Sequence, residues 1–216
     1  MTKRFAPATE RNRDPLLDVL QAYLPNQGTV LEIAAGTGQH AAFFAPHLAP
    51  RYWLPTDVDE ESLASIKSWA MEVHCETLLT PEQIDVLANV WPVEGRELPV
   101  PVTAIVNINM LHIAPWPCCD ALFSGASRLL ETSGVVVLYG PFKRRGEHTA
   151  YSNAAFDENL RARDPHWGVR DLEAVVAVAE RHDFECQTVL QLPANNLAVV
   201  FNRLLTGLLA ADATLL

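Results

Sequence analysis

The stretch from Thr29 to Asp57 constrains the fold of this 216-residue chain more than any other part of the sequence. The apolar residues in 30–33 are numerous enough for a buried parallel strand and too few for a helix. Gly36 and Gly38 follow, and the small and apolar residues 39–44 suit a helix lying against a sheet. Residues 51–57 predict the next strand, whose last residue, Asp57, comes 21 positions after Gly36. A strand, a glycine turn and a helix in this order let a ligand approach the backbone closely at the helix N-terminus.

The glycine turn alone leaves two classes of cofactor open, because residues 36–41 also fit the dinucleotide pattern G-x-G-x-x-G/A. Glu32 favours one of them, since a carboxylate at the end of the strand would repel a pyrophosphate placed over the turn. S-adenosylmethionine has no phosphate and carries an α-amino cation and a sulfonium. We therefore predict S-adenosylmethionine as the cofactor, with Asp57 accepting hydrogen bonds from its ribose hydroxyls. A NAD-dependent oxidoreductase is the less favoured alternative.

Residues 32–38 resemble the (D/E)-x-G-x-G-x-G motif of the class I S-adenosylmethionine-dependent methyltransferases. Ala34 stands where that superfamily has its first glycine. The resemblance implies cofactor contacts from Glu32, Ala34, Gly36 and Gly38, the two glycines bordering the methionine part. It also implies S-adenosylhomocysteine as the product.

The C-terminal part of the sequence supports the same fold. Residues 184–192 and 197–201 predict two strands joined by a turn-rich connection. A terminal β-hairpin after five β/α units distinguishes class I methyltransferases from dinucleotide-binding folds. We therefore expect an α/β fold with a Rossmann-like, doubly wound, seven-stranded sheet, mostly parallel with an antiparallel C-terminal hairpin strand, in a single domain over residues 1–216.

Longer strings resemble one branch of that superfamily, the methyltransferase-like protein 26 family, which was long known only as a domain of unknown function. They run through almost the whole chain and include residues 7–12, 32–40, 107–113, 138–142 and 193–197. This family implies a cofactor and a fold, and it does not imply a substrate.

Polar residues at the predicted strand ends are the candidates for chemistry. Asn107, Asn109 and His112 end an apolar strand that begins at residue 102, and such side chains are costly to bury without partners. Since ligands bind outside the carboxyl ends of parallel strands, we expect all three to face the cleft. The resemblance implies that Asp85, at the end of the third strand, binds the adenine amine; a helix or turn cap is its other role. Asn107 and Asn109 are further expected cofactor contacts.

A general base is needed only if the methyl acceptor binds protonated. His112 is the first candidate, because the unperturbed pKa of histidine is about 6.5, and Tyr139 is the second.

The acceptor is expected to be a small molecule, bound between the N-terminal arm, the strand ends and the loop before the last helix. Asp14 and Pro15 predict a helix start, so that residues 1–14 form an arm over the cofactor cleft. The expected substrate contacts, in addition to Asn109, His112 and Tyr139, are Glu10, Arg11, Asn153 and Arg170. The two arginines suit an anion, although either could pair with a protein carboxylate.

Composition excludes several classes of function. The net charge is −10 and the one compact basic cluster is residues 143–145, which disfavours a nucleic-acid partner. No apolar run is long enough to span a membrane and no secretory signal is apparent, so we expect a cytoplasmic protein. The four cysteines form no C-x-x-C pair, so no metal site is expected. A protein that binds S-adenosylmethionine without transferring its methyl group remains the alternative from another class.

Overall fold

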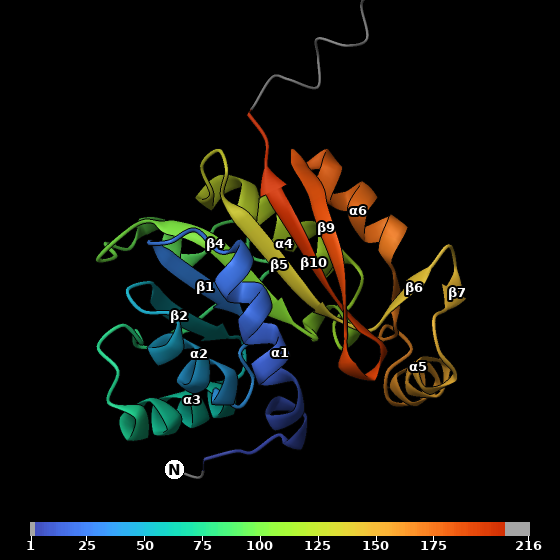
Figure 1. Cartoon of the computed structure of the whole chain (residues 1–216), viewed down its shortest axis with the longest axis horizontal. Helices are drawn as coiled ribbons and strands as arrows, with labels where there is room; N and C mark the ends of the chain where they lie inside the picture. Colours follow the sequence, from blue (N-terminus) through green and yellow to red (C-terminus); the bar gives the residue numbers. More distant parts are fainter. Residues whose placement is uncertain (1–2, 206–216) are drawn as a thin grey trace, which may run out of the picture.

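The computed structural model describes residues 3–205, so the first two residues of the predicted N-terminal arm lie outside it. Seven strands form the main sheet in the order β3-β2-β1-β4-β5-β10-β9 (Figure 1). Their bounds are β1 (Thr29–Ile33), β2 (Tyr52–Asp57), β3 (Glu82–Gln83), β4 (Val102–Ile108), β5 (Val135–Gly140), β9 (Phe184–Leu192) and β10 (Asn196–Arg203). The pairs among β1 to β5 are parallel, whereas β10 runs antiparallel to both β5 and β9. The predicted mostly parallel sheet with a C-terminal antiparallel hairpin is confirmed.

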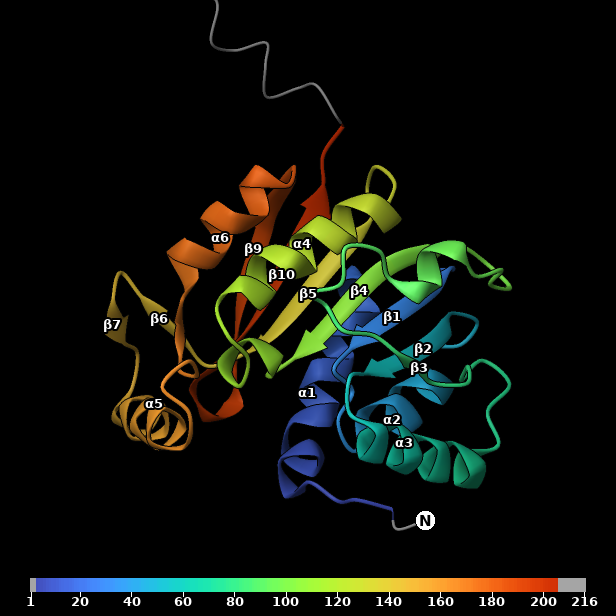
Figure 2. The same cartoon turned by 180° about the vertical axis from the view of Figure 1, so that it is seen from behind.

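Helices cover both faces of this sheet. Their bounds are α1 (Pro7–Tyr23), α2 (Gln39–His47), α3 (Glu60–Val73), α4 (Pro117–Leu129), α5 (Tyr151–Arg163) and α6 (Leu172–Arg181), and short 3-10 turns are η1 (Pro92–Gly95), η2 (Met110–His112) and η3 (Pro193–Asn195). In Figure 1, α1 and α2 lie in front of the sheet, and the reverse view in Figure 2 brings α4 and α6 to the front. The central strands are therefore buried on both faces, as expected for a parallel sheet.

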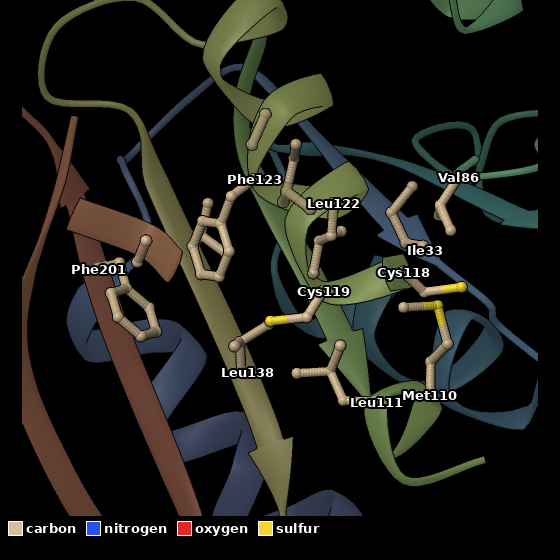
Figure 3. Packing of buried hydrophobic residues seen from close by; sticks show 14 of the residues in the cluster. Ile33, Val86, Met110, Leu111, Cys118, Cys119, Leu122, Phe123, Leu138 and Phe201 are labelled. Carbon is tan, nitrogen blue, oxygen red and sulfur yellow. The ribbon is translucent and has the colours of Figure 1, made fainter. Parts of the chain in front are cut away.

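Each face has its own apolar core. Leu16 of α1 and Phe44 of α2 pack with Val30 on one side of the sheet. On the other side, Phe123 of α4 packs edge-on against Phe201 of β10, at 5.1 Å between ring centroids (Figure 3). The parallel pairing of β1 with β2 and β4 brings the carboxyl ends of these strands to one edge of the sheet.

The first helix corrects the sequence prediction. It begins at Pro7, and Pro15 lies inside it instead of at its start. The reason is that the buried face of α1 includes the polar Thr9 and Asn12 in helical register with Leu16, and the Asn12 Oδ1 lies 2.8 Å from His40 Nε2 of α2. A pattern of apolar residues does not detect a helix that buries polar groups.

Other boundaries also differ from prediction. The third strand is only the pair Glu82–Gln83, since Pro81 precedes it, and it does not reach Asp85.

Residues 142–171 carry a second sheet in the order β7-β6-β8, formed by β6 (Phe142–Arg144), β7 (Glu147–His148) and β8 (Arg170–Asp171). Its strands are too short to produce a recognisable alternation. The Asp171 carboxylate caps α6, because it accepts a hydrogen bond from the Ala174 backbone N–H at 3.3 Å. Within residues 3–205, no helix combines the length and apolarity that crossing a membrane requires.

Candidate functional site

The turn between β1 and α2 holds three residues in the left-handed backbone region. Their φ values are 58° for Ala34, 59° for Gly36 and 86° for Gly38. Ala34 thus adopts the conformation for which glycine is usually required, at a cost that the surrounding contacts must offset. One such contact is the 2.7 Å hydrogen bond from the Ala35 N–H to the Thr56 carbonyl of β2.

The two glycines of the turn serve different purposes. A Cβ on Gly38 would lie 2.6 Å from the Ile66 Cα, so this glycine lets α3 approach the turn. A Cβ on Gly36 would meet no atom within 4 Å. The space above Gly36 is therefore open to a ligand that contacts the backbone.

Asp57 stands at the end of β2 beside this opening. Its carboxylate accepts hydrogen bonds from the Gly36 N–H at 2.8 Å and from the Asp59 N–H at 3.0 Å. Each carboxylate oxygen keeps a further lone pair, which a ribose hydroxyl could use. Asp59, in contrast, caps α3 by accepting from the Ser62 N–H and also pairs with Arg4 at 3.2 Å. Asp57 is thus the better placed of the two carboxylates.

Glu32 lies beneath the turn. Its side chain is 1% exposed, and its Oε2 accepts a 2.7 Å hydrogen bond from the Trp53 indole N–H. Burial raises the pKa of Glu32 to about 7; the Trp53 hydrogen bond partly opposes this, and the nearby Asp57 charge adds to it. Glu32 thus bonds to β2 through Oε2, and its contact with the cofactor stays a prediction.

We expect Glu32→Gln to stabilise the protein at alkaline pH. In the fold Glu32 keeps its proton up to about pH 7, whereas in the unfolded chain it loses the proton near 4.5. The wild type therefore loses stability as the pH rises between these values, by about 3 kcal/mol. Glutamine cannot ionise and avoids this loss. Urea unfolding of both proteins at pH 4 and pH 8 measures the difference; an equal gap at the two pH values would contradict this assignment.

The other predicted cofactor residues occupy the same edge of the sheet. Asn107 is buried, and its Nδ2 donates to the Ile33 carbonyl at 2.9 Å, so it joins β4 to β1. Its contact with the cofactor stays a prediction. Asn109 has a left-handed backbone with φ 67°, and its N–H donates to the Tyr139 carbonyl at 2.8 Å. Asp85 is exposed and its Oδ1 accepts from the Leu87 N–H at 2.9 Å, which is the turn-capping role.

The N-terminal segment crosses α3 and approaches the turn. The Arg4 N–H donates to Ser65 Oγ at 2.8 Å, and Ser65 Oγ donates in turn to the Thr37 carbonyl at 2.7 Å. The Ala6 N–H donates to the Gln39 side chain at the start of α2. The residues before α1 are therefore tied to the glycine turn.

A cavity of about 530 Å³ opens next to this edge of the sheet. Its walls come from α1, the ends of β4 and β5, the start of α5 and the connection between β9 and β10. The polar side chains that line it are Arg11, Asn12, Asn109, Tyr139, Ser152, Asn153 and Asn196. Four of the seven predicted acceptor residues therefore converge here: Arg11, Asn109, Tyr139 and Asn153. Sequence reasoning missed Asn12, which is hidden in a helix face, and also Ser152 and Asn196, at the starts of α5 and β10.

The other three predicted acceptor residues do not line the cavity. Glu10 is exposed to solvent on α1. The Arg170 guanidinium donates hydrogen bonds to three backbone carbonyls, those of Leu111 at 2.8 Å, Ala114 at 2.6 Å and His166 at 2.7 Å. It holds the loop after β4 in place and does not line the cavity.

His112 is buried behind the cavity. Its side chain is 1% exposed, packs 5.2 Å from the Phe142 ring centroid, and has no hydrogen-bond partner for either ring nitrogen among residues 3–205. Burial, followed by the Arg170 charge, lowers the pKa of His112 to about 3. Such a low pKa makes the imidazole a weak base, and the burial of the ring speaks against the predicted role of His112 as a general base at the cleft.

Tyr139 lines the cavity, but its hydroxyl is too weak an acid to act as a base at neutral pH. Burial raises the pKa of its hydroxyl above the ordinary 10.0, and the side chains of Asn12 and Asn196 oppose this less strongly. The phenol therefore keeps its proton at neutral pH and acts through hydrogen bonds. Within the described chain, no group of three or more His, Cys, Asp or Glu side chains could hold a metal ion.

A family model described as "Protein of unknown function (DUF938)" matches residues 3–203. The chain belongs to this family. Its fold is that of the class I S-adenosylmethionine-dependent methyltransferases, as solved structures show. An O-methyltransferase family 2 protein from Planctomyces limnophilus, in complex with apigenin, has a TM-score of 0.77 and 16% identity, over 91% of this chain and 58% of that one.

Two further structures are similar to this DUF938 member, and the first of them is described as a methyltransferase. The S-adenosylmethionine-dependent methyltransferase SibL in its apo form has a TM-score of 0.73 and 15% identity, over 92% and 56% of the two chains. The PH0226 protein from Pyrococcus horikoshii has a TM-score of 0.66 and 12% identity, over 92% of both chains. The chain spans little more than half of the first two structures.

Proposed function

We propose that this chain is an S-adenosylmethionine-dependent methyltransferase that acts on a small molecule. The observation that carries the proposal is the left-handed turn with open space above Gly36, beside Asp57 and next to a cavity of about 530 Å³. Such a volume lies within the range of small-molecule sites, roughly 300–1,000 Å³.

The residues at the turn fit this cofactor. The Gly36 backbone would lie against the methionine part, and Asp57 would accept hydrogen bonds from the ribose. Large exposed apolar residues stand at the same edge of the sheet, Val58 after β2, Leu87 after Asp85 and Ile113 after η2, and suit the adenine ring. The antiparallel hairpin of β9 and β10 also speaks against a dinucleotide fold. A pKa near 7 weakens the argument from the charge of Glu32, so the cofactor choice rests on the turn and the topology.

The cofactor, when bound, supplies a methyl group activated by a sulfonium. The contribution of the chain is then to position the acceptor and to exclude water. Arg11, Asn109 and Tyr139 line the cavity and would position the acceptor. The N-terminal segment tied to the turn by Arg4 and Ala6 would cover the cofactor.

A small acceptor is favoured over a nucleic acid. In the basic cluster 143–145, Lys143 pairs with Asp157 at 3.0 Å and Arg144 with Glu173 at 3.2 Å. Two of its three charges are thus neutralised within the protein, and the whole chain has a net charge of −10. A phosphate backbone requires the opposite distribution of charge.

Thermal unfolding with cofactors tests the proposal. S-adenosylmethionine and S-adenosylhomocysteine are expected to raise the melting temperature, as any ligand selective for the native state does, while NAD leaves it unchanged. A shift with NAD and none with S-adenosylmethionine would rule the proposal out. Formation of S-adenosylhomocysteine with an acceptor present separates a methyltransferase from a protein that only binds the cofactor.

A further inference from the structure

The cavity beside the glycine turn, called the acceptor cavity below, is lined by positive charge and by no negative charge. Arg11 is its only charged lining residue among the described residues, and no carboxylate, lysine, histidine or cysteine side chain lines it. Arg11 makes no ion pair within residues 3–205. Arg11 is exposed to solvent, so its guanidinium is free to attract an anion that enters the cavity.

The wall formed by α5 adds a second electropositive feature. Ser152 and Asn153, in the first turn of this 13-residue helix, line the acceptor cavity. The N-cap is Ala150, which makes no side-chain cap hydrogen bond. The free N–H groups and the dipole of a helix N-terminus attract negative charge. Arg11 and the α5 N-terminus belong to different walls of the same cavity, so their effects combine.

Tyr139 completes the set of hydrogen-bond donors. Asn12, Asn196 and Arg11 lie near its hydroxyl and lower its pKa, less strongly than burial raises it. The protonated phenol can donate a hydrogen bond to a ligand. The rest of the lining is apolar, with Phe156, Pro141 and Pro193 beside these donors.

Proton transfer limits the choice of acceptor. His112 is shielded and Tyr139 stays protonated, so no lining group removes a proton from a bound acceptor. At neutral pH an amine, a phenol or a thiol is mostly protonated, with pKa values of about 10, 10 and 8.5. A carboxylic acid, with a pKa of about 4, is already an anion.

We infer that the acceptor cavity binds a small carboxylate with an apolar body, and that a carboxylate oxygen is the methyl acceptor, held by Arg11. This inference rests on the proposed function. A lone pair of the carboxylate oxygen forms the O–CH3 bond while the S–CH3 bond breaks and leaves its electron pair on sulfur. A neutral methyl ester and neutral S-adenosylhomocysteine result, and no proton moves. The ester has lost the charge that Arg11 recognises, which favours its release.

Calorimetry of the protein saturated with S-adenosylhomocysteine tests the inference without turnover. The probes are phenylacetate, 3-phenylpropionate and indole-3-acetate, each with its amide, and phenethylamine as a cation. We expect at least one carboxylate to bind at least about 10-fold more tightly than its amide, and the amine not to bind. Arg11→Gln should lower the affinity for the carboxylate by roughly 10- to 100-fold, so that the carboxylate no longer binds more tightly than its amide. Arg13→Gln is the matched control, because Arg13 lies on the same helix and stacks 4.6 Å from the Phe43 ring, outside the cavity.

Two results would overturn the inference: no carboxylate binds more tightly than its amide, or Arg11→Gln leaves the affinities unchanged. If S-adenosylhomocysteine binds in these experiments but the carboxylates show no preference, the proposed function stands and only the acceptor class is wrong. If S-adenosylhomocysteine itself does not bind, the proposed function fails. With S-adenosylmethionine, the methylated product of the best carboxylate should release its methyl group as methanol in mild alkali, whereas an alkali-stable product contradicts ester formation.

Discussion

Replacing Gly36 by alanine is expected to weaken S-adenosylhomocysteine binding by roughly 100-fold while the protein still folds. The added methyl group meets no protein atom within 4 Å, so it occupies the open space where a ligand would contact the backbone. The variant retains a left-handed residue at φ 59°, which costs about 1–2 kcal/mol of stability. Calorimetry gives the affinity and urea unfolding gives the stability.

Gly146→Ala is the matched control for this effect. Gly146 also has a left-handed backbone, with φ 80°, and a Cβ there meets nothing within 4 Å, but it lies in the β6–β7 turn away from the cofactor site. We expect a similar loss of stability and an unchanged affinity for S-adenosylhomocysteine. Equal affinities of the Gly36→Ala and Gly146→Ala proteins would mean that the cofactor does not approach the turn.

Asp157→Asn is expected to destabilise the fold by on the order of 3 kcal/mol, because it removes the charge of a buried carboxylate that faces three basic side chains. The Asp157 side chain is 7% exposed and lies 3.0 Å from Lys143 Nζ, 3.1 Å from Arg161 Nε and 3.2 Å from His148 Nε2. It also accepts from the Val169 N–H at 2.7 Å. Burial alone would raise the pKa of Asp157, but these partners outweigh it and lower the pKa.

Asp120→Asn provides the comparison for the Asp157 variant. Asp120 also pairs with two basic residues, Arg181 at 2.9 Å and His182 at 3.1 Å, but its side chain is 52% exposed. Solvent screens such a pair, so a loss of less than about 1 kcal/mol is expected. Urea unfolding of both variants decides the point, and equal losses would show that burial does not set the strength of the Asp157 network.

The contacts of Asp157 also predict which part of the site the Asp157→Asn substitution disturbs. It joins β6, β7 and α5 to the segment before β8, and α5 forms one wall of the acceptor cavity. The glycine turn lies between β1 and α2, which make none of these contacts with Asp157. Asp157→Asn should therefore disturb carboxylate binding more than cofactor binding.

The sheet and the turn could be predicted from sequence because their signals are local. A short apolar run followed by Gly36 and Gly38 predicts a strand and a turn, and Asp57 falls where the next strand ends. The hairpin of β9 and β10 follows from two apolar runs around a connection rich in turn residues. Each of these features depends on residues that are close in the chain.

The individual roles at the site depend on three-dimensional packing, and there the sequence was insufficient. Glu32 and His112 are residue types that are common at active sites, but the fold buries both. Burial raises the pKa of Glu32 and lowers the pKa of His112, and so favours the neutral form of each. Arg170 finds carbonyl partners on the loop after β4, far away in sequence. Asn12 lies on α1 at the cavity because this helix begins at Pro7, before the start that Asp14 and Pro15 predict.

A crystal structure with S-adenosylhomocysteine bound tests the central claim most directly. We predict that the homocysteine part lies against the backbone at Gly36, that both ribose hydroxyls donate to Asp57, and that the sulfur faces the acceptor cavity at Asn109 and Tyr139. A ligand bound elsewhere, or one whose sulfur points away from that cavity, would contradict the account.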